Sequence, residues 1–234
     1  MKNRLFFVPC LILAAMAAQA APILTVGTPG DAEQSPATLP IPNLGEIFNF
    51  DSLSTSTSCQ DLLVGCPTFA PTTFASQGVS SISSPDGLLV FPFSTQSGPN
   101  ELFDNSSNGT ANVTIRLANA TTAIGIGIAD SDGEVLPSLT ITLQALNSTG
   151  GALGAPFVEN LASTESLTNT GNGYYVIRDT TADIFGLQIT QSVANANFSG
   201  LAIDDLQVAP EPSSFLLLAT GAALLAFFRL RQRA

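Results

Sequence analysis

The chain has 234 residues, with 18 acidic and seven basic side chains and neither histidine nor tryptophan. Residues 21–209 carry seventeen of the acids against two bases, Arg116 and Arg178, which gives this part a formal net charge of −15. Such a surface repels nucleic acid and anionic lipid, so a nucleic-acid partner is excluded. The lack of histidine removes the commonest general base and metal ligand, and the lack of tryptophan removes the largest sugar-stacking ring.

Residues 1–20 have the features of a secretion signal. Lys2 and Arg4 precede an apolar run over 5–18, and small residues at Ala18 and Ala20 occupy the positions that a signal peptidase reads. We therefore predict cleavage after Ala20. A proline interrupts the apolar run, which disfavours the alternative of a buried N-terminal helix.

The segment 21–45 contains five prolines and three glycines and has no periodicity, so we expect an extended leader that is not packed. The segment 46–209 is long enough to bury a core of its own, and we expect it to form one extracellular domain.

Short apolar runs alternate with turn residues through this domain. Runs with a period of two predict about eight strands. The predicted strands cover residues 47–53, 88–93, 111–118, 123–129, 139–145, 174–178, 184–190 and 201–208. They indicate a mostly β domain, an antiparallel β-sandwich that is jelly-roll-like. Helix is expected only in the N-terminal signal and in a short hydrophobic segment near the C-terminus.

Cys59 and Cys66 are the only cysteines that remain once the signal is removed. In an exported protein they meet an oxidising compartment, so we predict a disulfide between them. A thiol nucleophile would need a histidine or a cation beside it, and the sequence supplies neither nearby.

Asp204 and Asp205 interrupt the last predicted strand. The apolar residues before them and after them take opposite phases, so either both faces of the strand are covered or a β-bulge lies at the aspartates. Neighbouring strand residues point to opposite faces, so the two aspartates cannot serve as a catalytic acid and base, and we predict no catalytic residue. A bulge would present carboxylate and carbonyl oxygens, which suit a structural calcium ion shared with Asp51; the alternative is a polar strand end.

Tyr174 and Tyr175 are the only tyrosines. Alternation along the predicted strand turns one of them inward, so at most one could stack on a sugar ring. We expect them to pack in the core.

The C-terminus has three parts in a fixed order. Pro210, Glu211 and Pro212 are followed by an apolar run over 215–228 and then by Arg229, Arg231 and Arg233. A helix of this length reaches about 21 Å, which is short of the ~30 Å hydrocarbon core. The arginines should stay on the cytoplasmic side, which places the domain outside. The alternative is an ordinary short anchor.

This order resembles the sorting signal of PEP-CTERM proteins, which occur in Gram-negative bacteria that make exopolysaccharide. The resemblance covers residues 210–234. It implies that an exosortase, a membrane transpeptidase, cuts near 210–212 after a signal peptidase has removed residues 1–20. The protein would then be held by its C-terminal helix at the inner membrane transiently and end at the cell surface or outside the cell.

The short strings at 49–53, 185–187 and 201–206 resemble the terminal strands of the extracellular domain common in PEP-CTERM proteins. That domain is similar to carbohydrate-binding jelly rolls, in which acidic groups near the terminal strands hold a structural calcium. The resemblance thus implies the same ion near Asp51, Asp204 and Asp205.

These features favour an exported, non-catalytic surface or matrix protein that is associated with exopolysaccharide in biofilms. The first alternative is a lectin-like module with structural calcium. The second is a secreted hydrolase that uses two carboxylates, although no acidic pair lies in a recognisable motif.

Overall fold

The computed structural model describes residues 22–26, 44, 46–48, 50–55, 59, 65–92, 100–106, 110–129, 138–162, 173–193 and 201–209. The predicted signal peptide and sorting tail, with their helices, lie outside these residues. Within the described residues, no helix is long and apolar enough to cross a membrane. The elements are β1 (Ile23–Val26), β2 (Glu46–Phe48), the 3-10 helix η1 (Ala75–Gln77), β3 (Val79–Ser83), β4 (Leu88–Phe91), β5 (Glu101–Asp104), β6 (Thr110–Thr121), β7 (Ala123–Ala129), β8 (Ser138–Leu146), β9 (Phe157–Ala162), β10 (Gly173–Arg178), β11 (Ile184–Val193) and β12 (Ala202–Val208).

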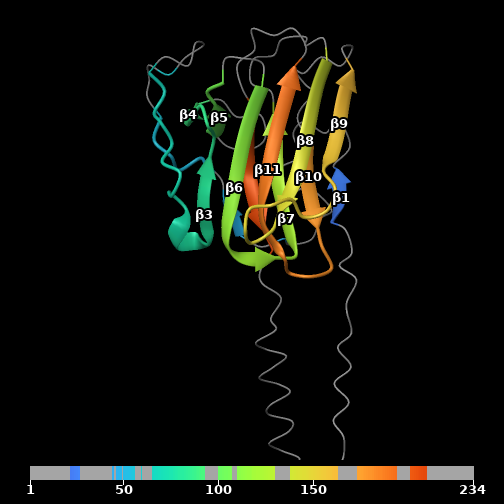
Figure 1. Cartoon of the computed structure of the whole chain (residues 1–234). Helices are drawn as coiled ribbons and strands as arrows, with labels where there is room; N and C mark the ends of the chain where they lie inside the picture. Colours follow the sequence, from blue (N-terminus) through green and yellow to red (C-terminus); the bar gives the residue numbers. More distant parts are fainter. Residues whose placement is uncertain are drawn as a thin grey trace, which may run out of the picture.

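The strands form two antiparallel sheets. The larger sheet has the order β1-β10-β7-β12-β5-β4, with β2 paired to β12, and the smaller has the order β3-β6-β11-β8-β9. Figure 1 shows the five-stranded sheet across the front of the molecule, with β7, β10 and β1 behind it. The prediction of a mostly β, antiparallel domain is confirmed, while the jelly-roll order stays a prediction.

The hydrophobic core lies between the two sheets. In β6 every second residue from Ala111 to Leu117 is buried, as the period of two predicts. Ile124, Ile126 and Ile128 of β7 belong to the same cluster and come from the opposite sheet. Full burial of each such side chain contributes about 1.5–3 kcal/mol, so these facing rows hold the sheets together.

Four strands were missed by the sequence prediction. β1 lies inside the segment expected to be an unpacked leader, and it pairs with β10 from Ile23↔Arg178 to Val26↔Tyr175. β3, β5 and β9 have too few alternating apolar residues to give a strand signal on their own. They form because a neighbouring strand offers its unpaired main-chain groups, and a sequence pattern does not record that tertiary cause.

The two alternatives left open for the last strand both hold: six of its seven residues are buried, and it contains a β-bulge. β12 pairs with β7 at Asp204↔Gly127 and next at Gln207↔Gly125, so β12 contains one extra residue. Asp205 has a φ of 49°, the left-handed conformation. The extra residue restores the phase, which allows Ile203 and Leu206 to reach the same core cluster.

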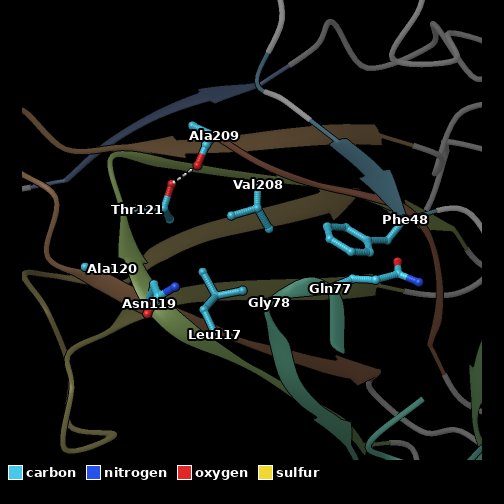
Figure 2. Close-up of a pocket in the computed structure, with 9 residues that line it drawn as sticks. All are labelled: Phe48, Gln77, Gly78, Leu117, Asn119, Ala120, Thr121, Val208 and Ala209. Carbon is cyan, nitrogen blue, oxygen red and sulfur yellow. Dashed lines mark hydrogen bonds between the residues drawn. The ribbon is translucent and has the colours of Figure 1, made fainter. Parts of the chain in front are cut away.

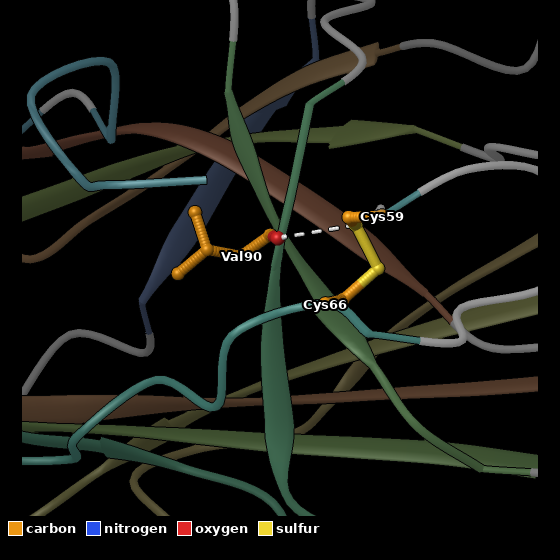
Figure 3. Close-up of a disulfide and its surroundings, with 3 residues drawn as sticks. All are labelled: Cys59, Cys66 and Val90. Carbon is orange, nitrogen blue, oxygen red and sulfur yellow. Dashed lines mark hydrogen bonds between the residues drawn. A yellow bond between two sulfur atoms is a disulfide. The ribbon is translucent and has the colours of Figure 1, made fainter. Parts of the chain in front are cut away.

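The predicted disulfide is present between Cys59 and Cys66. Cys59 is buried, and its Sγ lies 3.7 Å from the carbonyl oxygen of Val90 in β4 (Figure 3). A disulfide sulfur has no proton to donate, so this contact is packing rather than a hydrogen bond. The bridge thus holds the segment before β3 against the outer strand β4 of the larger sheet.

Candidate functional site

The outward surface of the five-stranded sheet consists almost wholly of hydroxyl and amide side chains. Its positions alternate with the buried residues of the same strands, and those whose exposure is described are half-buried or exposed. We call this set the polar face. It comprises Ser81 and Ser83 of β3, Thr110, Asn112, Thr114 and Arg116 of β6, Gln188, Thr190 and Ser192 of β11, Thr140, Thr142 and Gln144 of β8, and Val158 and Asn160 of β9.

The sheet register arranges these side chains in rows that cross the strands. One row runs Ser83, Thr114, Gln188 and Gln144, and a second runs Asn112, Thr190, Thr142 and Val158. A third contains Thr110, Ser192, Thr140 and Asn160. Neighbouring strands lie about 4.8 Å apart, so each row is a regular ladder of polar groups.

Hydrogen bonds fix several of these side chains in place. Gln188 Nε2 donates to Asn112 Oδ1 at 3.1 Å, and Thr140 Oγ1 donates to Asn160 Oδ1 at 2.9 Å, each across a strand pair. Gln144 Nε2 donates to the Ala145 carbonyl oxygen at 2.9 Å. These contacts reduce the rotamer freedom that binding would otherwise have to remove.

Arg116 is the one cation of the polar face. Its Nη1 donates to the carbonyl oxygen of Asn147 at 3.3 Å, and its Nη2 donates to that of Ser148 at 3.1 Å. A Cβ at Gly150 would lie 3.2 Å from the Nη1 atom, so the turn closes tightly on the guanidinium. Arg116 therefore holds the β8–β9 connection at one end of the face.

No carboxylate occupies an outward position of the described parts of these five strands. The face is therefore an uncharged patch, apart from one arginine, in a domain whose net charge is strongly negative. Hydroxyl and amide groups both donate and accept hydrogen bonds. A flat ladder of them can contact a hydroxyl-rich polymer at many points, each of them weak because it must replace hydrogen bonds to water.

Asp204 and Asp205, the predicted calcium ligands, lie in β12 of the larger sheet and are buried at the β-bulge. Asp204 is 1% exposed and Asp205 is 2% exposed. The backbone N–H of Asp205 donates to Asp204 Oδ1 at 2.8 Å, and the Tyr174 hydroxyl donates to the Asp205 carbonyl oxygen at 3.2 Å. Burial, and then the nearby Asp205 carboxylate, raise the pKa of Tyr174 well above its ordinary value.

Both tyrosines are buried, as expected from core packing. Tyr175 belongs to the main core, and Tyr174 packs with Leu44 and Val176 on the far side of the same sheet. A Cβ at Gly125 would lie 2.6 Å from the Tyr174 hydroxyl, so only a glycine leaves room for this ring. Neither ring offers a stacking platform for a sugar.

Asp51, which was expected to be a calcium ligand, forms hydrogen bonds to Asn100. Its Oδ1 accepts the Asn100 backbone N–H at 3.4 Å, and its carbonyl oxygen accepts Asn100 Nδ2 at 3.0 Å. Among the described residues, no three His, Cys, Asp or Glu side chains are grouped so that they could hold a metal ion. The structure does not assemble Asp51, Asp204 and Asp205 into such a group, and the calcium interpretation stays a prediction without structural support.

Asp104 is a further buried acid that the sequence did not single out. Its Oδ2 accepts the Asn112 N–H at 3.0 Å and the Ser84 hydroxyl at 2.9 Å, so it links β5 of the larger sheet to the smaller sheet. Burial raises the pKa of Asp104 above its ordinary value, and these hydrogen bonds oppose the shift. Its role is to join the sheets.

The polar face was not predicted from the sequence, although a signal for it exists. The same period of two that identified buried positions also places Ser, Thr, Asn and Gln at the alternate ones. Which of a sheet's two faces stays open depends on what packs against it, and the sequence pattern does not carry that information.

Solved structures of several β-rich domains are similar to this chain at low identity. One is a carbohydrate-binding module specific for non-crystalline cellulose, with 12% identity, a TM-score of 0.38 and coverage of 62% of this chain and 95% of that one. Another is a module solved with β-1,4-galactotriose, with 15% identity, a TM-score of 0.33 and coverage of 60% and 97%. A third is the enzymatically active domain of a tailspike protein of bacteriophage CBA120, with 16% identity, a TM-score of 0.34 and coverage of 54% and 18%. Such weak similarities do not bear on what this chain binds.

No protein of curated function matches the sequence. The C-terminal segment does match a family model, the PEP-CTERM protein-sorting motif, over residues 208–233. This match confirms the resemblance expected from Pro210, Glu211, Pro212 and the arginines that follow the apolar run. The chain therefore carries a PEP-CTERM sorting motif, which marks it as an exported, surface-directed substrate of an exosortase.

Proposed function

We propose that this protein is a non-catalytic surface or matrix protein that contacts extracellular polysaccharide through the polar face of its five-stranded sheet. The sorting motif supports the export and surface parts of this proposal. The observation that carries the binding part is the ladder of hydroxyl and amide groups, because the outward positions of its described strands hold no carboxylate.

The electrostatics of the domain support the choice of this face. A domain with a net charge of −15 repels anionic polymers over most of its surface, and repulsion falls where carboxylates are absent. Since the ladder lacks an aromatic platform, each contact is weak. Retention in a matrix would come from many such contacts along one polymer, and from many copies of the protein.

The test is co-sedimentation of the purified secreted protein with exopolysaccharide isolated from its native host. A triple variant changes Thr114, Thr142 and Thr190 to alanine and removes three hydroxyls from the centre of the face. Each lost hydrogen bond weakens binding by about two- to tenfold, so the three together should lower the affinity by about tenfold or more. The matched control changes Thr72, Thr73 and Thr180 to alanine, because these exposed threonines lie in turns away from the face.

Equal binding of the triple variant and the control would contradict the assignment of the polar face. Absence of binding by the unaltered protein would contradict the polysaccharide part altogether. Neither result would touch the sorting part, which is tested separately by the state of the C-terminus.

A further inference from the structure

The chain leaves the described domain at the end of β12, which is a strand of the larger sheet. Four strand ends are aligned across the larger sheet through the pairs Ile23↔Arg178, Arg178↔Ala123 and Val208↔Ile124. The start of β1 and the end of β12 therefore lie at the same end of the sandwich. The family match begins at Val208, the last residue of β12, so the sorting motif starts inside the folded domain.

Ala209, the last described residue, is held by both of its main-chain groups. Its N–H donates to the Ala123 carbonyl oxygen at 2.9 Å, and its carbonyl oxygen accepts the Thr121 hydroxyl at 2.8 Å (Figure 2). The Thr121 hydroxyl also lies 3.0 Å from the Ala123 carbonyl oxygen. A hydroxyl has one proton, and we assign it to the shorter contact with Ala209. We call this contact between Thr121 and Ala209 the exit latch.

The latch joins the hydroxyl of a buried residue, Thr121, to a half-buried residue, Ala209. Thr121 is 1% exposed. Val208 and Ala209 border a small open depression of about 110 Å³, whose lining includes the apolar residues Phe48 and Leu117 (Figure 2). The exit thus lies at an accessible edge of the domain, while the main chain of its last residue is already engaged.

We propose that the exit latch limits where the tail can be cut, and that Thr121 is a positioning residue for the sorting reaction. A protease binds its substrate as an extended main chain, and main-chain groups that are already paired in a sheet cannot be bound without local opening. The latch engages the carbonyl oxygen of Ala209, and Ala123 binds its N–H, so the segment available to the enzyme begins at Pro210. The inference rests on the sorting part of the proposed function and not on polysaccharide binding.

The first test is mass spectrometry of the C-termini of the mature protein from its native host, in the unaltered protein and in Thr121→Val. Valine keeps the shape and removes the hydroxyl, which should raise the population of the open end by about tenfold. We expect the unaltered protein to give chains that end at or beyond Pro210, and Thr121→Val to give additional chains that end at Val208 or Ala209.

Two controls separate positioning from stability. Thr121→Ser keeps the hydroxyl and should restore the original C-terminus. Thr73→Val removes another hydrogen bond from a threonine hydroxyl to a carbonyl oxygen, that to Ala70 at 2.6 Å, in an exposed turn of the chain before β3. It should leave the C-terminus unchanged, whatever its effect on melting temperature.

A second variant leaves the domain intact and inserts Gly-Ser-Gly-Ser between Ala209 and Pro210. If the fold limits the cut, the inserted residues become available and some chains should end within them. A single C-terminus at an unchanged distance from Pro210, in both this variant and Thr121→Val, would overturn the inference while leaving the sorting part intact. A tail that is never removed from the unaltered protein would overturn both.

Discussion

The two sheets use the same strand geometry and differ in what covers their outer faces. In the five-stranded sheet buried and open positions alternate, as in β6. In the larger sheet β5 is buried at all four positions and β12 at six of seven. Phe103 and Ala202, on the side away from the main core, form a small cluster of their own with Phe91. Strands β5 and β12 of the larger sheet are therefore buried on both faces, whereas the smaller sheet has one open face.

The largest expected effect comes from truncating a buried aromatic side chain, Phe103, on the side of the larger sheet that faces away from the main core. Phe103 is 1% exposed, and its ring centroid lies 5.8 Å from that of Phe91. Phe103→Ala should lower the free energy of unfolding by about 3–5 kcal/mol, as for a core residue. Thr142→Ala, at an outward position of the other sheet, should change it by less than about 0.5 kcal/mol. Urea denaturation followed by circular dichroism measures both, and similar losses would erase the contrast between the sheets.

A second prediction concerns the close approach of β11 to β6. A Cβ at Gly186 would lie 2.2 Å from the Ile115 carbonyl oxygen, and the main chain of β6 cannot move aside without breaking pairing. Gly186→Ala should therefore cost about 3 kcal/mol in the same assay. Gly151→Ala is the control, because its Cβ would meet only the end of the Asn147 side chain at 3.2 Å. If Gly186→Ala left the free energy of unfolding unchanged, the five-stranded sheet would tolerate distortion at this position and the prediction would be wrong.

The buried hydroxyl at the bulge gives a smaller effect. Tyr174→Phe removes the hydrogen bond to the Asp205 carbonyl oxygen and should cost about 1 kcal/mol at neutral pH. Because the pKa of Tyr174 is raised in the fold, its contribution is present below pH 10.0 and is lost as the pH rises further. The unaltered protein should lose stability more steeply above that pH than the variant. Parallel slopes in alkaline denaturation would argue against this assignment.

The smallest effect is expected at Asp104, where the two sheets are joined. Its raised pKa means that the folded state retains a proton more readily than the unfolded chain. Its contribution to stability is present below pH 3.8 and declines as the pH rises through the folded pKa. The free energy of unfolding of the unaltered protein, relative to that of Asp104→Asn, should therefore fall between pH 4 and pH 7. The midpoint urea concentrations of both proteins at pH 4 and pH 7 measure this change. A difference between the two proteins that is the same at both pH values would contradict the prediction.

The same contrast explains what the sequence could reveal. β6 and β8 were predicted because one buried face gives a period of two. β7 was predicted because isoleucines alternate with glycines, although both of its faces are buried. The bulge was one of two alternatives that the sequence offered, because the period shifts at Asp204 and Asp205. β5 was missed because burial on both faces removes the alternation. The disulfide and the sorting motif were predicted from residue type and order, which need no knowledge of packing.

The open face was missed for a related reason. Its residues, such as Thr142 and Thr190, have no feature that separates them from those of an ordinary solvated sheet. Only the register, which aligns them across β11 and β8, turns separate hydroxyls into rows. Long-range pairing of this kind is set by the whole fold rather than by local sequence.

A nearly uncharged set of outward positions on one sheet, in a domain that carries seventeen acids, also gives the domain a preferred orientation. A body with seventeen acids and one nearly uncharged side behaves as an electric dipole in the field of its neighbours. Approaching another copy, or an anionic polymer, it experiences a torque that turns the uncharged side toward them. This turning acts over roughly 10 Å at moderate ionic strength and fades as salt is added. Packing density of the protein at a crowded cell surface should therefore depend on ionic strength.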